Sequence, residues 1–141
     1  MSITISSDIF KLAKVFTISR GSRTEAKVLT VRIVKDGIAG WGECVPYSRY
    51  NETSDSVERQ IRGLSIDVTR ASLLDELPAG AARNAVDCAL WDLEAKRGGQ
   101  TIWQMIGWDP QPVTTVYTVG IDTPENMQKD ADRENMSGGC F

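Results

Sequence analysis

The sequence of 141 residues contains no histidine. Histidine is the commonest general base in enzymes and the usual partner of a nucleophilic serine or cysteine. Its absence therefore excludes these mechanisms, and imidazole metal sites, within these residues. Any acid–base chemistry of this chain would have to use Lys, Asp, Glu or Tyr side chains.

Cysteines are few and lie far apart. The three of them, Cys44, Cys88 and Cys140, are an odd number at wide spacing. This spacing excludes a disulfide framework and the paired arrangement of a zinc site.

Long hydrophobic runs and clusters of basic residues are also missing. A membrane helix needs about 20 consecutive apolar residues, and the first ten residues, MSITISSDIF, lack the basic and apolar regions of a signal peptide. Lys and Arg are scattered and the net charge is −3, so we expect neither a nucleic-acid partner nor a membrane partner. With 41% hydrophobic and 25% charged residues, the composition is typical of a globular protein, and we expect a cytoplasmic one.

Residues 8–43 predict an antiparallel meander of three strands. Hydrophobic and polar residues alternate, and Asp36-Gly37 indicates a tight turn before the last strand. Between the first two strands, SRGSRTE carries Arg20 and Arg23 and is longer than a tight hairpin needs. It predicts a loop with a functional role.

Helical patterns follow the strands. Hydrophobic spacing and capping residues predict helices over 53–64, 72–77, 81–98 and 101–107, the third of them stopped by Gly98-Gly99. Strands followed by helices indicate an α+β fold, a three-stranded meander and then a helical bundle, for a domain at residues 1–110.

The rest of the chain predicts a separate βα unit at residues 113–135. Asp109 to Pro112 indicates a linker, and an apolar run predicts a strand over 113–121. Thr123 as N-cap and Pro124 at the first helical position predict a helix over 124–135. Residues 136–141 form an atypical, glycine-rich tail.

Several polar and aromatic residues could serve function or structure. Asp92 could be a catalytic carboxylate, or a structural charge that ties its helix to a neighbour and pairs with Lys96. Glu43 could be catalytic at a strand end, or hydrogen-bonded locally on an edge strand whose glycines allow close backbone approach. We favour the structural interpretation for both, and packing for Trp103 and Trp108.

The loop arginines leave both interpretations open. Guanidinium groups such as those of Arg20, Arg23 and Arg49 suit bidentate recognition of carboxylate or phosphate, but exposed arginines are also common.

Four stretches in order carry a family resemblance: ISRGSRTEA, GWGECVPYSRYNET, LPAGAARNAVDCALWDLEAKR and YTVGIDTPENM. Over residues 8–132 the chain resembles the N-terminal part of enolase-superfamily enzymes of the muconate-lactonizing subgroup. Within the subgroup it is most similar to dipeptide epimerases of the L-Ala-D/L-Glu type.

The resemblance implies a capping domain followed by the incomplete βα start of a TIM-type barrel. In the full-length family, Mg²⁺ stabilises an enolate, and two lysines, one of them in a Lys-X-Lys motif, act as bases. This sequence contains no Lys-X-Lys. We therefore expect no catalytic residue, metal ligand or cofactor in this chain, and a truncated epimerase that is inactive alone.

The resemblance assigns this chain a role in shaping the site of a dipeptide substrate. The substrate-binding positions it implies are Arg20, Arg23, Tyr47, Arg49, Tyr50 and Thr118.

Two alternatives stay open. The chain could be a free-standing capping module for binding or assembly, forming a homodimer through the unpaired strand 113–121. The parent activity could also be that of a muconate cycloisomerase or an o-succinylbenzoate synthase.

Overall fold

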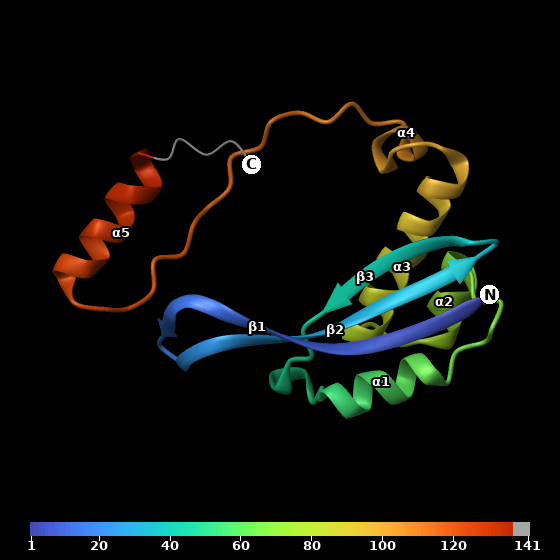
Figure 1. Ribbon diagram of the computed structural model, residues 1–141, viewed down its shortest axis with the longest axis horizontal. Coiled ribbons are helices and arrows are strands. Elements are labelled where there is room, and N and C mark those ends of the chain that lie inside the picture. Colours follow the sequence, from blue (N-terminus) through green and yellow to red (C-terminus); the bar gives the residue numbers. More distant parts are fainter. Residues whose placement is uncertain (137–141) are drawn as a thin grey trace. The chain divides into compact units, whose positions relative to one another are not determined.

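The computed structural model describes residues 1–136. A three-stranded sheet comes first, with β1 (Ser2–Ile18), β2 (Gly21–Lys35) and β3 (Ile38–Cys44) in the order β1-β2-β3 (Figure 1). This order confirms the predicted meander, although β1 begins earlier than expected. Asp36 and Gly37 have φ angles of 53° and 80°, and two positive φ angles are what the predicted two-residue turn requires.

The helices follow the sheet, as predicted. They are the short 3₁₀ helix η1 (Ser48–Tyr50), then α1 (Ser54–Arg62), α2 (Arg70–Glu76), α3 (Ala81–Gly98), α4 (Ile102–Ile106) and α5 (Pro124–Met136). Thr53, Thr69 and Thr101 each accept a hydrogen bond from a backbone N–H of the following helix, which fixes where α1, α2 and α4 begin. Helix α3 ends at Gly98 and is capped by Gly99, whose φ of 62° suits glycine.

Two compact units divide the chain. The first contains residues 1–9 and 27–109, and the second contains residues 10–26 and the chain from Pro110 onward. Strands β1 and β2 therefore contribute residues to both units.

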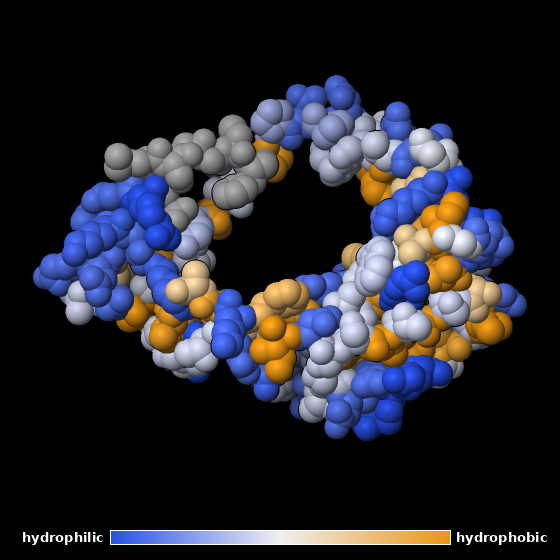
Figure 2. Space-filling model, viewed as in Figure 1, coloured by the Kyte–Doolittle hydropathy of each residue, from blue (hydrophilic) through white to orange (hydrophobic). Residues whose placement is uncertain are grey.

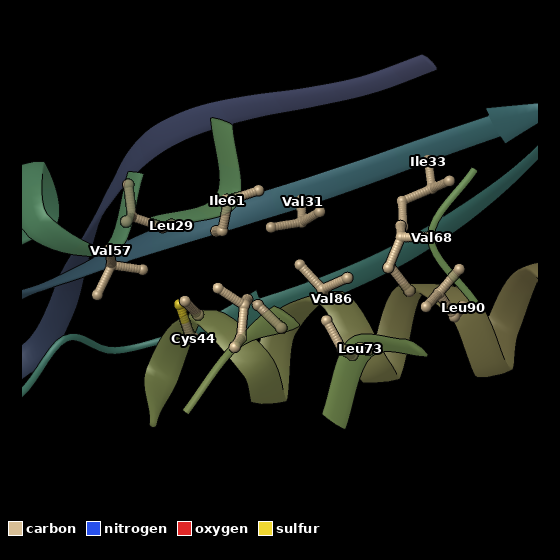
Figure 3. Close-up of a cluster of buried hydrophobic side chains, with 14 of the residues drawn as sticks. Leu29, Val31, Ile33, Cys44, Val57, Ile61, Val68, Leu73, Val86 and Leu90 are labelled. Atoms are coloured by element: carbon tan, nitrogen blue, oxygen red, sulfur yellow. The ribbon is translucent and has the colours of Figure 1, made fainter. Parts of the chain in front are cut away.

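The core of the first unit lies between the sheet and α3. Val31 and Ile33 of β2 are fully buried and face Val86 and Leu90 of α3 (Figure 3). Helices α1 and α2 also pack on α3. The core consists of Leu29, Val31, Ile33, Cys44, Val57, Ile61, Val68, Leu73, Leu77, Ala82, Ala85, Val86, Ala89, Leu90 and Leu93.

Two glycines of β3 allow α3 to lie directly on the sheet. Gly42 pairs with Val31 and Gly40 pairs with Ile33, so both glycines share the core face of the sheet with these side chains. A Cβ atom on Gly42 would lie 2.0 Å from the carbonyl oxygen of Ala85. The close backbone approach expected from the glycines of this strand is therefore confirmed.

The strand predicted over residues 113–121 is not formed, although the whole segment lies in the described part of the chain. Most of it is exposed, and Figure 2 shows hydrophobic residues along the connection between α4 and α5. The prediction was wrong because an apolar pattern makes a strand only where a neighbouring strand accepts its backbone hydrogen bonds.

Helix α5 begins as predicted, at Pro124. The backbone N–H of Asn126 donates to the side chain of Thr123 at 3.3 Å, and Glu125 lies in the first turn. The surface of this helix is largely hydrophilic (Figure 2). Of the predicted tail at 136–141, residues 137–141 lie outside the described residues.

Candidate functional site

The segment between β3 and α1, residues 45–53, is called the second loop here and carries three of the predicted substrate-binding residues. Tyr47 precedes η1, and Arg49 and Tyr50 lie within it. The rings of Tyr47 and Tyr50 meet edge to face, with their centroids 5.7 Å apart. The two tyrosines line a cavity of about 480 Å³, together with Asn84 of α3. Arg49 is exposed and does not line this cavity.

Glu52 holds this loop in place, and the sequence analysis did not single it out. Its Oε2 atom accepts a hydrogen bond from the backbone N–H of Tyr47 at 3.1 Å. Its Oε1 atom accepts one from the backbone N–H of Ala81, the first residue of α3, at 2.7 Å. The only signal in the sequence was that Gly80, before α3, has no side chain to cap the helix.

The loop predicted between the first two strands is a tight turn instead. Residues 19 and 20 form the turn, and β2 begins at Gly21, whose φ is 132°. Arg20 therefore lies in the turn, while Arg23 lies on β2. The polar residues on either side of the turn belong to the paired strands β1 and β2. The hydroxyls of Thr17 and Ser22, for example, are 2.9 Å apart across the hairpin.

Arg23 lines a cavity in the second unit. This cavity has a volume of about 460 Å³ and is also lined by Phe16 and by Tyr117, the neighbour of Thr118. Basic, acidic and apolar groups all contribute to its wall, and its lining residues are Leu12, Ala13, Lys14, Phe16, Arg23, Glu25, Ala26, Tyr117 and Arg133.

Backbone and side-chain contacts tie the segment with Thr118 to the first hairpin. The N–H of Ile121 donates to the carbonyl of Thr17 at 2.8 Å, and Lys14 forms an ion pair with Asp130 of α5. Thr118 itself is exposed. The structure thus groups Arg20, Arg23 and Thr118 in one unit, and Tyr47, Arg49 and Tyr50 in the other.

Asp92 has the structural role that the sequence analysis favoured. Its Oδ2 atom accepts a hydrogen bond from the backbone N–H of Trp41 at 2.9 Å and one from Lys96 at 2.5 Å. Lys96 also donates to the carbonyl of Ala39 at 3.2 Å. Asp92 and Lys96 together fasten α3 to β3.

The other residues weighed in the sequence analysis are at the surface. Glu43 is exposed on β3. Trp103 and Trp108 pack edge to face with ring centroids 5.3 Å apart, which agrees with the packing role expected for them.

Cys44 is buried at the end of β3, beside the second loop. Burial, and then the negative charges of Glu52 and Glu43, raise the pKa of its thiol from 9.0 to about 11. The thiol therefore stays protonated at neutral pH and is a poor nucleophile.

The raised pKa of Cys44 predicts a loss of stability in alkali. The folded state holds the thiol proton up to about pH 11, whereas the unfolded state releases it near pH 9.0. The contribution of Cys44 to the free energy of unfolding is therefore complete below pH 9.0 and is lost as the pH rises from 9.0 to about 11. We expect the difference in free energy of unfolding between the parent chain and Cys44→Ala, measured with urea, to shrink as the pH rises from 8 to 11. A constant difference between the two proteins would contradict the prediction.

No group of three or more His, Cys, Asp or Glu side chains in residues 1–136 is arranged to hold a metal ion. The donors of this part of the chain therefore do not fit the magnesium site that the resemblance implies for the full-length family. Nor is any helix in the described part both long and apolar enough to cross a membrane.

Comparison with known proteins identifies the fold. Residues 1–107 match the family model of the mandelate racemase / muconate lactonizing enzyme N-terminal domain. The L-Ala-D/L-Glu epimerase of Escherichia coli is 45% identical over an aligned length of 135 residues, and the match covers 92% of this chain and 42% of the relative. The chain thus spans about two fifths of the length of this curated relative.

Two solved structures agree. An enolase family member from Agrobacterium tumefaciens with homology to dipeptide epimerases, solved with sodium and L-Ala-L-Glu, has a TM-score of 0.85 and 41% identity. The match covers 93% of this chain and 42% of that one. A dipeptide epimerase from Enterococcus faecalis, solved with Mg and L-Leu-L-Tyr, has a TM-score of 0.81 and 26% identity over 96% of this chain and 42% of its own. This chain belongs to the mandelate racemase / muconate lactonizing enzyme family of the enolase superfamily, through its N-terminal capping domain.

Proposed function

We propose that this chain supplies the capping domain and the first barrel segment of a dipeptide epimerase that acts on L-Ala-D/L-Glu-like dipeptides. The observation that carries the proposal is the similarity to the E. coli epimerase along nearly the whole chain. The chain's own part is to bind and orient the substrate, and it supplies neither catalytic residues nor metal ligands.

The arginines of the first hairpin suit such a substrate. An L-Ala-Glu dipeptide carries two carboxylates, and a guanidinium group binds a carboxylate through two parallel hydrogen bonds. Arg20 lies in the turn of the hairpin, and Arg23 lies on the following strand beside the segment that contains Thr118. Tyr47, Arg49 and Tyr50 of the second loop are further proposed contacts, and they belong to the first unit.

A chimeric enzyme tests the proposal. Residues 1–107 of this chain are joined to the remainder of the E. coli epimerase, and exchange of the glutamate α-proton of L-Ala-D-Glu is followed by NMR in D₂O with Mg²⁺. We expect the chimera to catalyse the exchange, and the 141-residue chain alone to show none. The E. coli protein without its N-terminal domain is the control.

Two results would contradict the proposal. A folded chimera without activity would show that this capping domain does not serve an epimerase of that specificity. Exchange catalysed by the 141-residue chain alone would show that the bases and the metal site are not where we place them.

Assembly is a second candidate function, and the exposed segment 113–121 favours it. Val113, Val116 and Ile121 are 79%, 90% and 54% exposed. We propose that two copies pair through this segment, because a second copy would supply the missing strand neighbour. Light scattering should give twice the chain mass of 15.5 kDa, and the chain mass for Val116→Asp. A monomer for both proteins would contradict this candidate.

A further inference from the structure

Glu52 joins two parts of the chain that are far apart in sequence. One carboxylate oxygen accepts the N–H of Tyr47, before η1, and the other accepts the N–H of Ala81, at the start of α3. Each oxygen thus serves a different segment. A glutamine could serve only one of them, because its NH₂ group would face the other N–H donor.

The start of α3 is built to receive this carboxylate. Gly80, the N-cap residue, offers no side chain, and Glu52 takes the place of a local cap. A Cβ atom on Gly80 would lie 2.8 Å from Oε1 of Glu52, and apart from its chain neighbours no other residue has an atom within 4 Å of it. The glycine therefore leaves the space that the carboxylate occupies.

The position of Glu52 also matters for the cavity of the second loop. Glu52 lines the cavity together with Tyr47 and Tyr50. Without it the backbone N–H of Tyr47 would lose its acceptor, while the bond between Tyr50 N–H and Tyr47 C=O would keep the turn itself closed. The turn would then be free to shift as a body relative to α3.

We propose that Glu52 is a positioning residue that sets the place of Tyr47 and Tyr50 relative to α3, and through them the affinity for the dipeptide. The link to the dipeptide rests on the proposed function. The role of Glu52 in positioning the loop does not rest on it, since that role follows from the two hydrogen bonds of Glu52 and from the space beside Gly80.

The loop part is tested on the 141-residue chain by amide hydrogen exchange and ring–ring NOEs. In Glu52→Gln, the amide of Tyr47 or of Ala81 should exchange about tenfold faster, and the Tyr47–Tyr50 NOE should persist. Gly80→Ala should have a similar effect, because it displaces the carboxylate without removing it. Glu58→Gln, a glutamate on α1 that pairs with Arg62, is the matched control. Unchanged exchange at both amides in Glu52→Gln would overturn the proposal.

The substrate part is tested in the chimeric enzyme. We expect Glu52→Gln and Gly80→Ala to raise KM for L-Ala-D-Glu about fivefold with kcat within twofold, and Glu58→Gln to change neither. If the loop amides respond but KM does not, the substrate link is overturned. If the unmodified chimera is inactive, the proposed function fails, while the exchange data still decide the role of Glu52 in the loop.

Discussion

Replacing Gly42 by alanine is expected to destabilise the folded chain by about 3 kcal/mol, because the added methyl group would overlap with backbone atoms of α3. The new Cβ would lie 2.0 Å from the carbonyl oxygen of Ala85 and 2.8 Å from the backbone nitrogen of Ala89. Both atoms belong to the backbone of α3, so relief requires the helix to move off the sheet. Urea unfolding monitored by tryptophan fluorescence measures the loss.

Gly98→Ala is the matched control for this substitution. Gly98 is the last residue of α3, and the nearest atom to its added Cβ would be the side-chain oxygen of Gln100 at 3.8 Å. Alanine is the better helix former, so the variant should be as stable as the parent or more stable. If Gly42→Ala and Gly98→Ala unfolded at the same urea concentration, the close approach of α3 to β3 would be refuted.

Replacing Arg20 by methionine is expected to lower kcat/KM of the chimeric enzyme for L-Ala-D-Glu about 30-fold. The proposed function assigns the guanidinium a substrate carboxylate, and a hydrogen bond to a charged group contributes about 1.5–3 kcal/mol. Lysine keeps the charge but not the two parallel donors, so Arg20→Lys should recover part of the loss. Steady-state kinetics with Mg²⁺ present provide the comparison.

Arg59→Met is the control for the loss of a positive charge. Arg59 is exposed on α1 and is not among the proposed contact residues. Its replacement should change kcat/KM less than twofold. Equal losses in Arg20→Met and Arg59→Met would show that Arg20 acts only through the net charge of the domain.

The fold could be predicted further than the candidate site. The contacts of Arg20 and of the second loop come from the family resemblance and stay proposals, and the loop expected to carry Arg20 and Arg23 is a tight turn, with Arg23 on β2. A polar sequence is compatible with both a strand and a loop, so pairing across the hairpin decides which of the two forms there. Glu52 was missed because its two partners are backbone N–H groups, one of them in a helix 29 residues away.

The sequence by itself determined the elements whose signals are local. Asp36-Gly37 specifies its turn through positive φ angles, and Thr53, Thr69 and Thr101 specify helix starts through hydrogen bonds within one turn. Only the tertiary structure decided which glycines of β3 contact α3 and that Asp92 fastens α3 to the sheet. It also decided that residues 113–121 form no strand. These outcomes depend on atoms brought from distant parts of the chain, and for the segment 113–121 on a neighbouring strand that the described part of the chain does not contain.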